Sequence, residues 1–208
     1  MIFFAVRLPR GIEQMSVRRT VGVGVCSGVL AMLAGSAMAQ AQQSPEARTP
    51  WSVYVEGGTT MEGNSKSELA AAGVTYSFGP RHALWGGVVS TYGDFFVANW
   101  RAHRDYLGDQ TYNQIGMVAN ARYRFDGGAS PWFTDLGLGL TWFDGYYKTD
   151  SRTFSTRFQF TEVLGVGRNF GVTGAHEVSL RVLHVSNGSI KKPNPGENLV
   201  KLRYAYRF

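Results

Sequence analysis

The segment Trp132-Phe-Thr-Asp-Leu-Gly-Leu-Gly-Leu-Thr-Trp142 alternates between two kinds of side chain. One parity is predominantly apolar with a tryptophan at each end, and the other is mostly small or polar and includes Asp135. Successive side chains of a β-strand point to opposite faces of the sheet, so this segment predicts a strand with one apolar and one polar face.

The same alternation recurs at 70–78 and 117–125, and it runs to the C-terminus. Val200, Leu202, Tyr204, Tyr206 and the terminal Phe208 share one face of this last segment, opposite Lys201, Arg203 and Arg207. A soluble β-sandwich also alternates, but aromatic residues at both ends of the apolar face are typical of the girdles of outer-membrane barrels. An alternating strand that ends on Phe resembles the assembly signal of outer-membrane proteins.

Segments of this kind give eight candidate strands. They lie near 51–57, 68–78, 83–97, 112–125, 132–146, 154–168, 175–187 and 198–208. We therefore predict an all-β fold, an eight-stranded antiparallel transmembrane β-barrel of the outer membrane, because an open sheet edge in lipid would leave backbone groups unpaired. Short links at 79–81, 126–131 and 171–174 would face the periplasm. Longer links at 58–67, 98–111, 147–153 and 188–197 would be extracellular.

Two details of this barrel can be anticipated. A lumen enclosed by eight strands is filled by side chains, so the inward residues Arg122, Arg124, Arg203 and Arg207 should find Asp135 or glutamates as partners there. The segment 154–168 is irregular, because Glu162 continues the outward parity of Phe158 and Phe160 and would meet lipid. A bulge or an early strand end is expected at this point.

The N-terminal segment has the pattern of a secretory signal peptide. Arg18 and Arg19 precede an apolar run that ends in a small-x-small site at Ala37-Met38-Ala39. We predict a signal peptide over 1–39, a short tether over 40–50 and the barrel over 51–208, with Met1 and Met15 both open as the start. The only cysteine, Cys26, would leave with the signal peptide, so no disulfide is expected in the exported chain.

Composition excludes several classes of protein. The 208 residues are 44% hydrophobic and 17% charged with 26 glycines, which argues against a disordered chain and against a helical bundle. The net charge of +6 falls to +3 without residues 1–39, so a nucleic-acid partner is not implied. His82, His103 and His176 show no shared ligand spacing, and neither a metal nor a cofactor is expected.

The pair His184 and Ser186 is the first candidate for chemistry. The residues continue the outward parity of Val178, Leu180 and Val182 and are neighbours on one face of the predicted strand. An imidazole beside a hydroxyl can take its proton as the oxygen attacks a carbonyl. From spacing alone, a polar pair satisfied by lipid headgroups and water is the favoured interpretation.

A resemblance changes that balance. The segment His184-Val-Ser-Asn-Gly-Ser-Ile-Lys-Lys-Pro-Asn-Pro-Gly-Glu-Asn198, with the alternating end that follows, resembles the lipid A deacylase family of the PagL type. The resemblance implies an eight-stranded outer-membrane barrel with a Ser-His-Glu site on its outer face. It also implies hydrolysis of the ester-linked acyl chain at position 3 of lipid A, with lipopolysaccharide of the outer leaflet as the substrate.

Carried over residue by residue, the resemblance implies Ser186 as nucleophile and His184 as general base. Asn194, with the backbone of Asn187 or Gly188, matches the part of the family that stabilises the oxyanion.

The acidic residue is open between two positions. Glu197 is the only carboxylate in the motif and is the preferred partner for His184, yet the family pattern can place its glutamate one position later, at Asn198. Asn198 also shares the outward parity of Val200, whereas Glu197 does not. Asn198 would orient the imidazole as asparagine does in Cys-His-Asn enzymes.

Two other functions remain open at this point. One is a non-catalytic structural or adhesive barrel, and the other is a lipid A acyltransferase. Sequence also leaves open whether the barrel forms a homodimer. Lys191 and Lys192 can be read as a solvated loop or as a contact for lipid phosphates.

Overall fold

A computed structural model describes residues 49–61, 66–105 and 108–208. The predicted signal peptide and most of the predicted tether lie outside these residues. No helix in the described part of the chain is long and apolar enough to cross a membrane.

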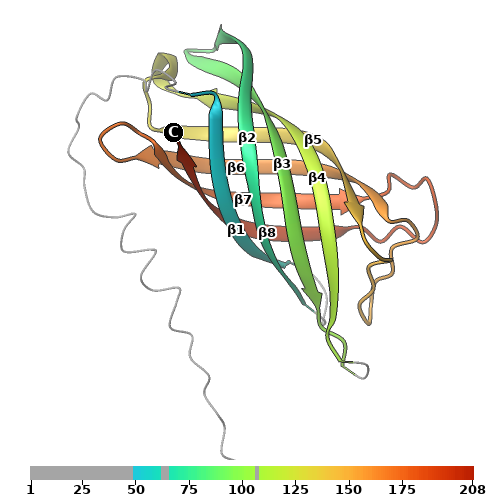
Figure 1. Ribbon diagram of the computed structural model, residues 1–208. Coiled ribbons are helices and arrows are strands. Elements are labelled where there is room, and N and C mark those ends of the chain that lie inside the picture. Colours follow the sequence, from blue (N-terminus) through green and yellow to red (C-terminus); the bar gives the residue numbers. More distant parts are fainter. Residues whose placement is uncertain (1–48, 62–65, 106–107) are drawn as a thin grey trace, which may run out of the picture. The chain divides into compact units, whose positions relative to one another are not determined.

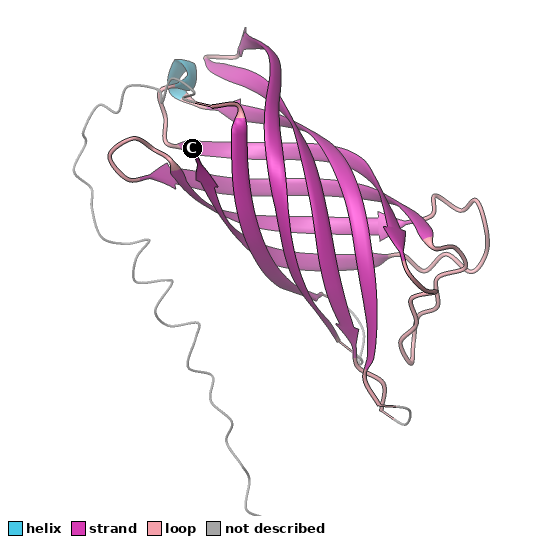
Figure 2. Cartoon of the chain, in the orientation of Figure 1, coloured by secondary structure: helices cyan, strands magenta, loops and turns pink. Residues whose placement is uncertain are grey.

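Eight antiparallel strands form a closed barrel (Figure 1), which confirms the predicted fold. Each strand pairs with the next along the chain, and β8 pairs with β1. A single turn of 3₁₀ helix, Asp126–Gly128, interrupts the strands and turns of the described chain (Figure 2). The strands are β1 Trp51–Thr60, β2 Ser67–Leu84, β3 Gly87–Ala102, β4 Gln110–Arg124, β5 Trp132–Phe143, β6 Phe158–Phe170, β7 His176–Ser186 and β8 Glu197–Arg207.

The predicted link at 79–81 was wrong. β2 pairs with β3 beyond these residues, the register shifts between Phe78 and His82, and the chain reverses at Trp85 and Gly86. Gly79 adopts a φ of +75°, and Pro80 has no N–H to offer the ladder. Gly79 and Pro80 therefore interrupt the pairing of β2 with β3 locally, and the strand continues beyond them.

The bulge predicted around Glu162 was also wrong. β6 pairs without a register shift with β5 on one side and β7 on the other. Glu162 consequently keeps its outward parity, is exposed, and stands directly opposite His184 of β7.

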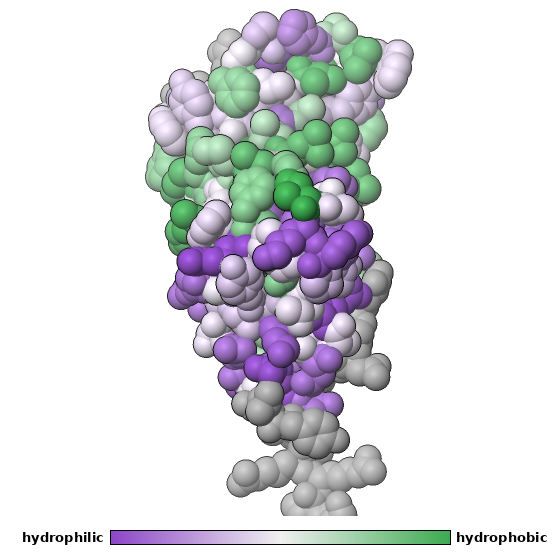
Figure 3. Space-filling view, turned by 90° about the vertical axis from the view of Figure 1, so that its right-hand side faces the viewer, coloured by the Kyte–Doolittle hydropathy of each residue, from purple (hydrophilic) through white to green (hydrophobic). Residues whose placement is uncertain are grey.

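The outer wall is apolar. Leu136, Leu138 and Leu164 are 63%, 65% and 61% exposed. In Figure 3 hydrophobic side chains form a band in the upper half of the view, and hydrophilic side chains gather below it. An outward apolar band of this kind is the surface that membrane barrels present to lipid.

Half of the interior is a balanced set of buried charges. Arg122 binds Asp135 at 2.8 Å and Glu177 at 2.6 Å, and Arg203 binds Glu56 and Asp94, both at 2.8 Å. The pairing predicted for Arg122 and Arg203 is confirmed. Four carboxylates face four cations across the lumen, namely Glu56, Asp94, Asp135 and Glu177 with Arg122, Arg181, Lys201 and Arg203.

The other half of the interior, towards the long loops, is an aromatic plug. Trp100, Phe143, Tyr147 and Phe154 are at most 2% exposed, and their rings pack with centroids between 4.8 and 6.2 Å apart. The ends of β7 and β8 pack on this plug, which holds the polar residues of those strand ends in fixed positions.

Neutralising one interior carboxylate should destabilise the barrel. Glu56→Gln leaves Lys201 and Arg203 without the charge that both contact, and breaking such a buried pair costs about 3–5 kcal/mol. We expect a lower free energy of unfolding in urea for barrels folded into detergent or vesicles. Glu68→Gln, on an exposed β2 side chain, is the matched control. Equal unfolding midpoints for the two variants would contradict this role of the network.

Candidate active site

Packing of β7 on the plug directs His184 and Ser186 outwards. Leu183 and Val185, which alternate with them, are 2% and 0% exposed inside the barrel. Since neighbouring side chains of a strand point to opposite faces, His184 and Ser186 must lie on the outer wall, where both are half-buried. The structure thus places the predicted histidine and serine on the same face of β7, two residues apart.

The imidazole is held by Asn198. The register pairs His184 with Asn198 of β8, and His184 Nδ1 lies 2.7 Å from Asn198 Oδ1. An amide oxygen only accepts hydrogen bonds, so Nδ1 carries the hydrogen in this contact. The neutral imidazole then has its lone pair on Nε2, the nitrogen that can act as a base.

The structure corrects the predicted placement of Glu197. Glu197 pairs with Val185, so its side chain is on the inner face of the sheet, where it is 2% exposed. It accepts a hydrogen bond from the Tyr147 hydroxyl at 3.3 Å and lies 3.5 Å from Arg152 Nε. The sheet itself separates Glu197 from the outward imidazole, and Asn198, the alternative residue, is the one that meets His184.

Tyr147 completes this inner cluster. Burial raises the pKa of its hydroxyl, which therefore stays protonated and can donate to Glu197. Its oxygen also lies 2.7 Å from Ser67 Oγ. Glu197 thus anchors the start of β8 from within, one residue before the asparagine that orients His184.

The loop 187–196 is anchored by Asn187. Its side-chain amide, which is buried, donates to Ser155 Oγ at 2.9 Å and to the Lys191 carbonyl at 2.8 Å. Its backbone N–H donates to Asn194 Oδ1 at 2.9 Å. Asn187 and Asn194, both predicted for oxyanion stabilisation, are therefore in contact, and the Asn187 N–H is already used in holding Asn194.

Two glycines let this loop pass close to the site. Gly188 has a φ of +61°, and a Cβ there would lie 3.1 Å from the Phe160 ring. Gly196 has a φ of +63°, and a Cβ there would lie 2.8 Å from His184 Cε1. A larger residue at position 196 would be strained and would displace the imidazole.

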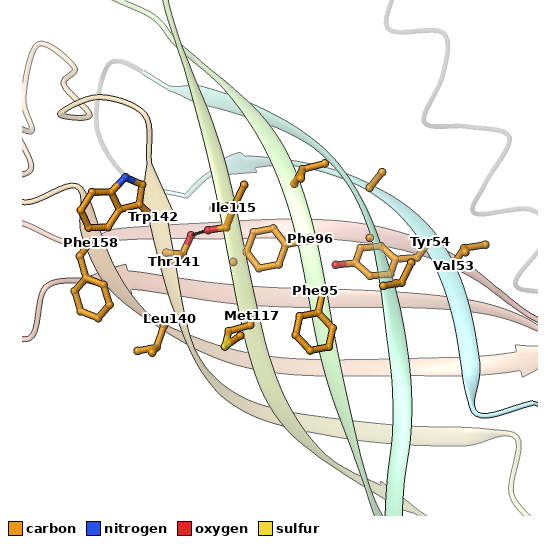
Figure 4. A pocket seen from close by; sticks show the side chains of 15 residues that line it. Val53, Tyr54, Phe95, Phe96, Ile115, Met117, Leu140, Thr141, Trp142 and Phe158 are labelled. Carbon is orange, nitrogen blue, oxygen red and sulfur yellow. Dashed lines mark hydrogen bonds between the residues drawn. The ribbon is translucent and has the colours of Figure 1, made fainter.

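An apolar groove of about 730 Å³ lies on the wall formed by β1 to β5 and reaches β6 at Phe158 (Figure 4). Its lining includes Phe95, Met117, Leu140, Trp142 and Phe158. The Phe158 ring packs edge-on against Phe160 with centroids 5.2 Å apart, and Phe160 is the β6 partner of Ser186. The groove thus reaches the strand next to the serine.

Comparison with known proteins identifies the family of the chain. The family model described as Lipid A 3-O-deacylase (PagL) matches residues 70–207. The chain belongs to this family. The predicted resemblance to PagL-type deacylases is thereby confirmed.

Individual relatives of the PagL family cover different shares of the chain. It is 40% identical over 76 residues to the lipid A deacylase PagL of Bordetella bronchiseptica (strain ATCC BAA-588 / NCTC 13252 / RB50). That segment is 36% of this chain and 41% of the relative, so the match spans about two fifths of the relative's length. The crystal structure of the outer membrane enzyme PagL matches with a TM-score of 0.63 and 21% identity, covering 76% of this chain and 99% of that one. At this identity the second likeness concerns the fold.

One neighbour of the His184 imidazole was not predicted. Glu162 was expected to need a bulge, whereas the regular pairing of β6 with β7 places it opposite His184. Its outward parity was the available signal. Which residue of β7 stands opposite Glu162 depends on the register of the two strands, and the sequence does not give this register.

We expect Asn187→Ala to loosen the PagL-family loop. The substitution removes both side-chain hydrogen bonds, each of which contributes about 0.5–1.5 kcal/mol. Trypsin should then cut after the exposed Lys191 about tenfold faster, and mass spectrometry of the fragments measures this rate. Asn99→Ala, an exposed amide on β3, should leave the rate unchanged. Equal cleavage of both variants would mean that Asn187 does not hold the loop.

Proposed function

We propose that the protein is an outer-membrane esterase that hydrolyses the 3-O-linked acyl chain of lipid A. The observation that carries this proposal is the outward His184–Asn198 pair, with His184 Nδ1 2.7 Å from Asn198 Oδ1, beside Ser186 on the apolar outer wall. A hydroxyl and an oriented imidazole are the components of acyl transfer. Membership of the lipid A 3-O-deacylase family supplies the substrate class.

The reaction follows from the roles of these residues. Ser186 Oγ attacks the ester carbonyl carbon while His184 Nε2 takes the hydroxyl proton. As the ester C–O bond breaks, the imidazolium returns this proton to the leaving oxygen of lipid A, and an acyl-serine remains. Water, deprotonated by the same imidazole, then attacks the acyl-serine, which releases the fatty acid and restores Ser186. Asn198 keeps the imidazole in the tautomer that these transfers require.

Stabilisation of the oxyanion falls to the loop 187–196. Asn194 is fixed through its oxygen, which accepts the Asn187 N–H, so its amide nitrogen is the side-chain donor that can face the developing charge. The Gly188 N–H is the second donor in this proposal. Asn187 acts indirectly, because it holds Asn194 through its backbone N–H and precedes Gly188 in the anchored loop.

The setting of the site suits a lipid substrate. After export and removal of residues 1–39, the loop end of the barrel would face the outside, and the ester would reach Ser186 laterally from the outer leaflet. The aromatic pair Phe158 and Phe160 on β6, next to Ser186, provides an apolar surface for acyl chains. Lys191 and Lys192, exposed in the adjoining loop, can meet the phosphates of lipopolysaccharide.

The test is the mass of lipid A from cells that make the wild type or Ser186→Ala. We expect loss of one hydroxyacyl chain with the wild type and none with the variant, because no other group in the proposed site can form the acyl intermediate. Unheated gel migration of both barrels controls for folding. Ser151→Ala, an exposed serine of the 144–157 loop, should retain full activity.

Each alternative function predicts a different result. An acyltransferase would move the chain to a second lipid, and no free fatty acid would form. A non-catalytic barrel would leave lipid A unchanged with every variant. Full activity of Ser186→Ala would exclude Ser186 as the nucleophile.

A further inference from the structure

A carboxylate lies on the outer wall at a position where lipid alone would not favour it. Glu162 is outward and exposed on β6, and the outward residues on either side of it along the strand are Phe160 and Leu164. Its opposite neighbour on β5 is Leu138. An ionised carboxylate among such groups is costly unless it has a partner.

The register places His184 opposite this carboxylate. Glu162 pairs with His184 across the β6–β7 ladder, and both side chains point outwards. Residues directly opposite in an antiparallel pair have Cβ atoms about 4.5–5.5 Å apart, within reach of a carboxylate and an imidazole. Among the described strand residues, no lysine or arginine stands directly opposite Glu162 on β5 or β7.

We propose that Glu162 supplies the negative charge that balances the His184 imidazolium during the reaction. This inference rests on the proposed function and adds a positioning residue to it. Asn198 and Glu162 divide between them two tasks that one carboxylate could perform. Asn198, on β8, fixes the tautomer through Nδ1, and Glu162, on β6, stabilises the charge.

The surroundings of the imidazole favour this division. Asn198 and Gly196, which contact the ring from β8 and the preceding loop, carry no charge. Glu197 is on the opposite face of the sheet, already engaged with Tyr147 and Arg152. Glu162 is therefore the carboxylate that stands opposite His184 on the outer face.

Two further cations are in the adjoining loop. Lys191 and Lys192 are exposed, and the Lys192 ammonium donates to Ser189 Oγ. They add positive potential near the site and would disfavour an imidazolium. A fixed negative charge opposite His184 counters this effect.

The test compares pH–rate profiles of lipid A deacylation by the wild type and Glu162→Gln. A neighbouring carboxylate favours the protonated imidazole, so the acidic limb of the variant should shift to lower pH. The rate on the plateau should fall about tenfold, because the imidazolium of the transition state loses its balancing charge. A side chain with a structural role alone would not move the acidic limb.

Returning the charge from the other side should restore activity. In Glu162→Gln/Asn198→Glu the carboxylate contacts the imidazole from β8, and we expect most of the lost rate and the position of the acidic limb to recover. Glu68→Gln, an exposed carboxylate on β2, is the matched control and should behave as the wild type. Glu162→Leu, which matches Leu138 and Leu164, serves if the Gln variant fails to assemble.

NMR titration of isotope-labelled histidines separates this inference from the proposed function. The His184 signal, assigned with a His184→Asn variant, should respond to pH differently in Glu162→Gln and in the wild type if Glu162 acts on the imidazole. This readout needs no turnover. An inactive wild type would therefore overturn the deacylase proposal while the titration still decides on Glu162. Identical titrations and identical pH–rate profiles would overturn the role of Glu162.

Discussion

Because the sheet closes on itself, each strand residue faces either the filled interior or the apolar outer wall. Backbone hydrogen bonding around the whole barrel fixes which residues stand opposite each other, and a shift by one residue would reverse both faces. The site depends on this constraint. His184 and Ser186 point outwards because Leu183 and Val185, which alternate with them, are packed inside. Glu197 points inwards because it pairs with the inward Val185.

The two halves of the interior hold the site in different ways. Opposite charges pair across the lumen towards the short turns. Each of the four carboxylates there lies within hydrogen-bonding distance of a cation. The aromatic plug towards the long loops contains Trp100, Tyr147 and Phe154, and Tyr147 donates to Glu197 at the start of β8. A rigid plug behind a thin sheet keeps outward side chains in place without a pocket around them.

The site is assembled across three neighbouring strands. β7 provides Ser186 and His184, β8 provides Asn198, and β6 places Glu162 on the other flank of the imidazole. The register thus places a carboxylate, Glu162, and an asparagine, Asn198, opposite His184 on its two flanking strands. Within the motif, sequence proximity places Ser186 near His184. The register of neighbouring strands places Asn198 and Glu162 near it.

The sequence by itself determined the eight strands, the inward and outward faces and the outward His184–Ser186 pair, because each follows from an alternation with a period of two residues. The alternation of β8 also indicated that Glu197 faces inwards. At a loop–strand junction, however, the face of a residue is not fixed until its pairing is known. Only the tertiary structure decided that Asn198 meets His184 and that Glu162 fits a regular strand without a bulge. Both facts depend on which residue of a neighbouring strand stands opposite, and register is a property of the closed sheet that no single segment contains.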